Sequence, residues 1–128
     1  PLPPTLGVVE ETVMRIQVRA GEKAGNVLRT AAERRLRFAL GRFERRIASI
    51  DVRFGDVNGP RGGVDQACRV AVRLAAPAGQ IVIEDMDRDA HAALARAADR
   101  MARAVGRAVD LARRGRHRTP MALREVRS

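Results

Sequence analysis

Arginine side chains between Asp89 and Arg114 recur at a spacing that could bind an anion. On a helical projection they fall within a wedge of about 60°, and small apolar side chains recur on the opposite face. The arginines are Arg96, Arg100, Arg103, Arg107 and Arg114, and the apolar residues are Ala90, Leu94, Ala97, Met101, Val105, Ala108 and Ala112. The pattern predicts a helix that packs on a core and presents a row of guanidinium groups. These groups repel one another, so a polyanion lying along them would relieve the repulsion.

A second helix, predicted over residues 27–47, carries its basic charge on one side as well. Its core face is Leu28, Ala32, Leu36, Ala39, Phe43 and Ile47; Arg34, Arg35, Arg42 and Arg45 share one flank, and Glu33 and Glu44 the other. The alternative explanation for the basic faces is a genome that generally favours arginine over lysine, which would agree with Lys23 being the only lysine. Such a preference would not place the charge on one side of both helices, so the pattern favours a binding surface.

Alternating apolar and polar residues predict four strands, at 14–19, 48–54, 66–74 and 80–85. Asn26 is a candidate N-cap for the first helix, and Asp87 or Asp89 for the second. The order β-α-β-β-β-α predicts an α+β fold, in which both helices cover the apolar face of a four-stranded sheet. The other face of the sheet is expected to be basic, through Arg15, Arg19, Arg53, Arg69 and Arg73.

Length and charge narrow the class of protein. The 128 residues lead us to expect one domain over residues 13–113, with a flexible extension at 1–12 and a basic flexible tail at 114–128. The net charge of +10 favours an anionic partner, either nucleic acid or a membrane surface. Because the chain has one cysteine and no apolar run of membrane-spanning length, we expect a cytoplasmic protein.

Other kinds of site fit the sequence poorly. His91, His117 and Cys68 do not form a metal-binding pattern, and Cys68 is expected to be a small core residue. No nucleophile and base are suitably arranged, so we expect neither an enzyme nor a cofactor or small-molecule substrate. Arg61, with the amides of Gly62 and Gly63, could cradle a phosphate or could simply lie in an exposed hairpin loop.

Several motifs match a known family. In the first helix, L-R-x-x-x-E-x-K-L corresponds to Leu28, Arg29, Glu33, Arg35 and Leu36. In the second, D-x-x-A-A-I followed by D-K-L-x-R-x-L-x-K corresponds to Asp89, Ala92, Ala93 and Leu94, then Asp99, Arg100, Met101, Arg103, Val105 and Arg107. With the loop DVNGPRGGVDQACR, these residues resemble the ribosome hibernation-promoting factors, also called ribosome-associated inhibitor, sigma-54 modulation or ribosomal subunit interface proteins. His91 and Ala95 depart from the family's usual tyrosine and aspartate.

The resemblance implies a fold similar to a double-stranded-RNA-binding domain, and binding to the small ribosomal subunit and its rRNA where messenger and transfer RNA would lie. Longer family members carry a second, dimerising domain. The length of this chain leads us to expect the short form, which would be monomeric when free.

Three functions remain open at this point. The first is ribosome hibernation through the candidate RNA-binding residues Arg34, Arg35, Arg42, Arg45, Arg61, Arg96, Arg100, Arg103, Arg107 and Arg114. The second is a general double-stranded-RNA or messenger-RNA-binding module, and the third is a basic helix on anionic lipid, which the alanine-rich second helix favours least. Without Trp or Tyr, and with its Phe residues expected largely on core faces, the chain should recognise RNA backbone and shape.

Overall fold

The computed structural model describes residues 14–20, 25–58, 64–75 and 78–115. The predicted extension at 1–12, most of the predicted tail and Arg61 lie outside them. The elements in chain order are strand β1 (Ile16–Arg19), helix α2 (Gly25–Leu40), the 3-10 helix η1 (Gly41–Arg46), strands β2 (Ile47–Asn58), β3 (Val64–Ala75) and β4 (Ala78–Asp87), and helix α3 (Ala90–Arg114). The predicted β-α-β-β-β-α order and α+β class are confirmed.

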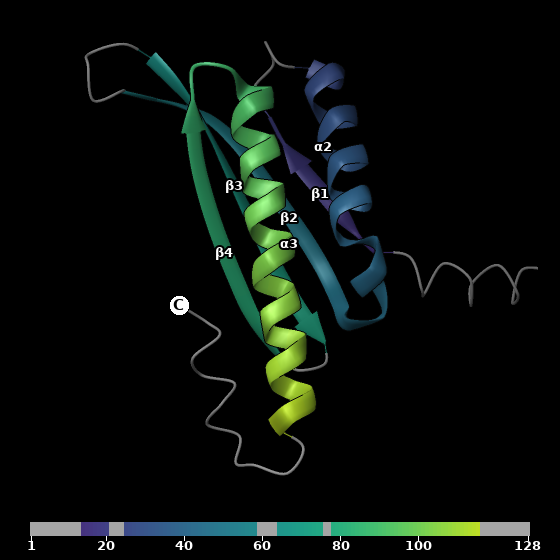
Figure 1. Cartoon of the computed structure of the whole chain (residues 1–128). Coiled ribbons are helices and arrows are strands. Elements are labelled where there is room, and N and C mark those ends of the chain that lie inside the picture. Colours follow the sequence, from purple (N-terminus) through teal and green to yellow (C-terminus); the bar gives the residue numbers. More distant parts are fainter. Residues whose placement is uncertain (1–13, 21–24, 59–63, 76–77, 116–128) are drawn as a thin grey trace, which may run out of the picture.

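The four strands form one mixed sheet in the order β1-β2-β3-β4. The edge strand β1 pairs in parallel with β2, whereas β2, β3 and β4 are antiparallel neighbours. Helix α2 is the crossover that a parallel β1–β2 pair requires. Helices α2 and α3 lie side by side on one face of the sheet (Figure 1). No described helix covers the other face, here called the open face.

The core lies between this helical layer and the sheet. The alternation of each strand supplies one side of the core, through residues such as Val52, Val70 and Val72, all essentially inaccessible to solvent. Helix α2 contributes four apolar residues spaced one turn apart, Leu28, Ala32, Leu36 and Leu40. The buried face of α3 is mostly small, comprising Ala93, Leu94, Ala97, Ala98, Met101, Ala104, Val105, Ala108 and Val109.

The two helices begin differently. Helix α2 starts at Gly25, whose φ of 56° lies in the left-handed region that glycine tolerates best, so the prediction of Asn26 as N-cap is wrong. Helix α3 is capped by Asp89, whose side chain accepts a hydrogen bond from the His91 amide at 3.0 Å. Of the two candidates for this cap, Asp89 is therefore the one confirmed.

The first helix is also shorter than predicted. The α-helix ends at Leu40, the chain continues as a 3-10 helix to Arg46, and Ile47 begins β2. The apolar spacing through Phe43 and Ile47 mimicked a continuing α-helix, but these two residues reach the core from the 3-10 turn and from the strand. Glycine at position 41 has low helical propensity, which favours the change of helix type at this point.

One glycine inside α3 offers a test of this packing. A Cβ added at Gly106 would lie 3.6 Å from Cζ of Phe43, which is ordinary van der Waals contact. Because glycine is less favourable than alanine in a helix interior, Gly106→Ala should raise the free energy of unfolding by roughly 0.5–1 kcal/mol. Urea unfolding of the two proteins measures the change, and a loss of stability would show that α3 and η1 pack more closely than described.

Candidate nucleic-acid interface

The arginine row of α3 divides into two parts with different surroundings. Near the start of the helix, Arg96 contacts Asp85 at 3.2 Å and Asp87 at 3.0 Å, and donates to the Met86 carbonyl oxygen at 2.7 Å. Arg100 contacts the other oxygen of Asp85 at 3.0 Å and donates to the Glu84 carbonyl oxygen. These two arginines attach α3 to the end of β4 and neutralise charge there, although each remains about half exposed.

Asp85 is the centre of this cluster. Its side chain is only 17% exposed and accepts hydrogen bonds from both arginines and from the Met86 amide. Partial burial raises the pKa of the Asp85 carboxyl, but the hydrogen bonds from Arg100 and then Arg96 outweigh that effect and hold the pKa below its ordinary value of 3.8. The carboxylate form therefore joins sheet to helix at neutral pH.

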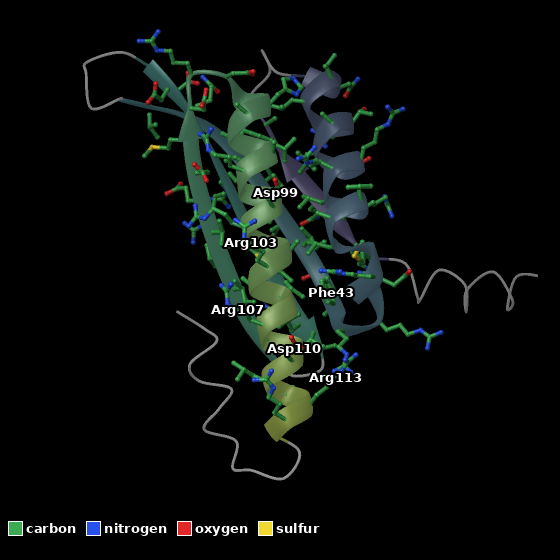
Figure 2. The ribbon with its side chains drawn as sticks, viewed as in Figure 1. Phe43, Asp99, Arg103, Arg107, Asp110 and Arg113 are labelled. Atoms are coloured by element: carbon green, nitrogen blue, oxygen red, sulfur yellow. The ribbon has the colours of Figure 1, made fainter. Side chains whose placement is uncertain are left out.

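Further along α3, Arg103 and Arg107 have no such partners among the residues that the structure describes. Because β4 turns directly into α3, this part of the helix lies beside the first half of β4, whose residues AGQIVI carry no ionisable side chain. Both arginines are exposed and lie on the β4 side of α3 (Figure 2). Within the described ranges, no ion pair involves either of them, so their charge remains available to an anion.

Helix α2 and η1 place their predicted arginines differently. Arg35 pairs with Asp99 of α3 at 3.5 Å and so contributes to the contact between the helices. The guanidinium carbon of Arg42 lies 4.7 Å from the centroid of the Phe43 ring, a cation–π distance. Arg34 and Arg45 are exposed, as is Arg114 at the end of α3.

Phe38 is a feature that the sequence reasoning missed. Its side chain is 87% exposed on α2, and the exposed Arg34 lies one helical turn before it. The signal was available, because a helical projection places Phe38 almost opposite the buried Leu36. An exposed phenyl ring on a basic helix can stack on an unpaired base while nearby cations contact phosphates.

Of the residues considered for metal binding, His91 is exposed on α3 and His117 lies outside the described residues. Cys68 is a buried core residue, as predicted, and burial, with smaller effects of Asp85 and Glu84, raises the pKa of its thiol to about 12. Across the described ranges, no group of three or more His, Cys, Asp and Glu side chains could hold a metal ion. In the same ranges, neither helix combines the length and apolar character needed to cross a membrane.

The Asp85 cluster gives a pH-dependent stability. Because the pKa of Asp85 is depressed in the folded state, its carboxylate stabilises the fold above the pKa of the unfolded chain. This contribution is lost as pH falls through the lower folded pKa, that is, below roughly pH 4. Asp85→Asn should lower the free energy of unfolding at pH 7 by about 1 kcal/mol and reduce the further loss on acidification.

Urea unfolding at pH 7 and pH 3 provides the measurement. Asp110→Asn is the matched control, because it removes the same charge from an exposed position on α3. If Asp85→Asn lost as much stability on acidification as the unchanged protein, another carboxylate would have to account for the effect.

Comparison with known proteins supports the fold. The chain is similar to the crystal structure of the N-terminal domain of Protein Y from Thermus thermophilus, with a TM-score of 0.57 and 21% sequence identity. The similarity covers 74% of this chain and 97% of that domain. No protein-family model matches the sequence, and no curated protein matches it significantly. The described residues therefore share their fold with the N-terminal domain of Protein Y.

Proposed function

We propose that this protein binds the small ribosomal subunit in the channel for messenger and transfer RNA and so keeps idle ribosomes inactive. The helix motifs resemble hibernation factors, and the fold likeness to the Protein Y domain agrees with that resemblance. The observation that carries the proposal is the pair Arg103 and Arg107, exposed and without a carboxylate partner among the described residues.

The proposed contact surface, here called the helical surface, is the outer side of the two-helix layer. It comprises Arg34, Phe38, Arg42, Arg45, Arg103, Arg107 and Arg114. Guanidinium groups pair bidentately with phosphates, and such contacts position a protein on RNA without reading its sequence. Arg35, Arg96 and Arg100 have a secondary role in this proposal, because each already pairs with a carboxylate. Arg61 remains a candidate contact outside the described residues.

The lipid-binding alternative has little support in the structure. Helix α3 turns its large apolar side chains, including Leu94 and Met101, into the core. The exposed large apolar residues of the described ranges are Val27 and Phe38 on α2, and Val82 and Met86 on β4. A helix lying in a membrane interface needs bulky apolar anchors on one exposed face, and α3 presents none among them.

The ribosome proposal is tested by reversing the free charges of α3. Arg103→Glu with Arg107→Glu should abolish co-sedimentation with small subunits in a sucrose gradient, because two phosphate contacts become repulsions. The fold should survive, because both side chains are exposed and bound to no other described residue. Arg29→Glu with Arg88→Glu makes the same change in net charge at exposed positions outside the helical surface, and should retain most of the binding.

The same gradients report on assembly. A monomer should sediment alone at the top, and on binding it should move with single subunits or ribosomes without creating ribosome pairs.

For the charge-reversal test, equal loss of binding in both double variants would indicate a general charge effect. Undiminished binding of the Arg103→Glu, Arg107→Glu variant would refute the helical surface.

Phe38 supports a second candidate function, a module for single-stranded messenger RNA. If a base stacks on its ring, Phe38→Ala should weaken binding to a short unstructured RNA by about 5–150-fold, since such contacts contribute roughly 1–3 kcal/mol. Stability should change little, because the ring is 87% exposed. Phe38→Tyr retains an aromatic face and should bind as the unchanged protein does.

Fluorescence anisotropy with the RNA, and sedimentation with ribosomes, separate the two functions. A loss confined to the unstructured RNA would favour the messenger-binding module. A loss confined to ribosomes would place Phe38 in the ribosomal contact, and no loss in either assay would remove Phe38 from the helical surface.

A further inference from the structure

The open face of the sheet, opposite the helices, carries a row of arginines at matching positions on three strands. Arg19 of β1 is the register partner of Arg53 of β2, and Arg53 is the partner of Arg69 of β3. Side chains at partner positions have Cβ atoms about 5 Å apart on the same face. Three guanidinium groups are thus anchored side by side across the sheet, and all three residues are exposed.

Like charges at directly opposite positions destabilise a sheet, and nearby carboxylates usually compensate them. Two carboxylates lie close to this row: Glu84 is the register partner of Arg69, and Asp51 precedes Arg53 by two residues. The ion pairs of the described residues join neither carboxylate to any of the three arginines. The repulsion along the row is therefore only partly relieved within the described part of the chain.

The row borders a hollow in the surface. A depression of about 230 Å³ is lined by Arg19, Asp51, Val52, Arg53, Arg69, Ala71 and Gln80. Ala71 is the register partner of Asp51 and of Val82, and its small side chain leaves room in the middle of the sheet. Arginine residues from three strands and Gln80 from the fourth thus line a space larger than a phosphate group.

We propose that this hollow is a phosphate-binding site, held by Arg19, Arg53 and Arg69 with Gln80 as an additional donor. The ligand is a phosphate group, carried either by an RNA backbone or by a small phosphate compound. A bound phosphate would pair with adjacent guanidinium forks and relieve the repulsion along the row. The site lies on the opposite side of the domain from the helical surface and does not depend on the ribosome proposal.

Asp51 makes the proposal specific, because its carboxylate lines the same hollow and would repel a phosphate. Removing that charge while keeping the shape, in Asp51→Asn, should therefore strengthen phosphate binding by roughly threefold, as expected for one charge near the protein surface. Removing two cations, in Arg53→Gln with Arg69→Gln, should weaken it by about tenfold. An open surface that binds no phosphate would respond to neither change.

The test is a titration of the full chain with pyrophosphate at fixed ionic strength, followed by NMR of the backbone amides. The amides of β2 and β3 around Arg53, Arg69 and Ala71 should shift, with the changes in affinity given above. Arg53→Lys with Arg69→Lys keeps the charge, and its affinity for pyrophosphate should lie between the affinities of the unchanged protein and the Gln variant. Arg103→Gln with Arg107→Gln, on the opposite face, should leave the sheet shifts unchanged.

Repeating the titration with a short single-stranded RNA identifies the source of the phosphate. Shifts of the same amides would assign the site to the RNA backbone, and shifts with pyrophosphate alone would assign it to a small phosphate compound. The site would be refuted if pyrophosphate shifted only amides of the helices. It would also be refuted if Asp51→Asn and the Arg53→Gln, Arg69→Gln variant bound pyrophosphate with equal affinity. If the unchanged protein failed to co-sediment with ribosomes while these titrations gave the expected results, only the proposed function would be refuted.

Discussion

The burial of the small apolar face of α3 against the sheet and α2 is the constraint on which the rest of the structure depends. Alanine at positions such as 97, 98 and 108 lets the helix lie close to β3 and β4, and every one of these side chains is fully buried. The buried face determines the rotation of the helix about its axis. That rotation places the arginine row along β4, where the sequence of the strand decides the partner of each arginine.

The division of the arginine row follows from the way β4 leads into α3. The acidic end of the strand, with Asp85 and Asp87, comes immediately before the helix, so it meets Arg96 and Arg100. The uncharged start of the strand lies beside Arg103 and Arg107. Two arginines thus contribute to stability and two remain available for binding, although all four have the same residue type and nearly the same position on a helical projection.

The domain carries basic charge on two surfaces separated by its core. The helical surface combines exposed arginines with an exposed phenyl ring, whereas the open face of the sheet combines a row of arginines with a shallow hollow. A domain basic on both sides is suited to a narrow passage between RNA segments, where phosphates approach from more than one direction. Its binding would then depend on shape and charge more than on nucleotide sequence.

The sequence by itself determined the order of the strands and α-helices, most of the apolar faces and the basic character of both surfaces, and it restricted the cap of α3 to Asp87 or Asp89, because each follows from local spacing along the chain. It also contained the position of Phe38 on the exposed side of α2. The end of the α-helix at Leu40 was less accessible, since apolar residues of η1 and β2 continue the helical spacing. Only the tertiary structure decided which arginines of α3 pair with carboxylates. The carboxylates that bind Arg96 and Arg100 lie on a different element, β4, 9 to 15 residues away. The hollow on the open face likewise depends on strand register, which brings together Arg19, Arg53 and Arg69 from distant parts of the chain.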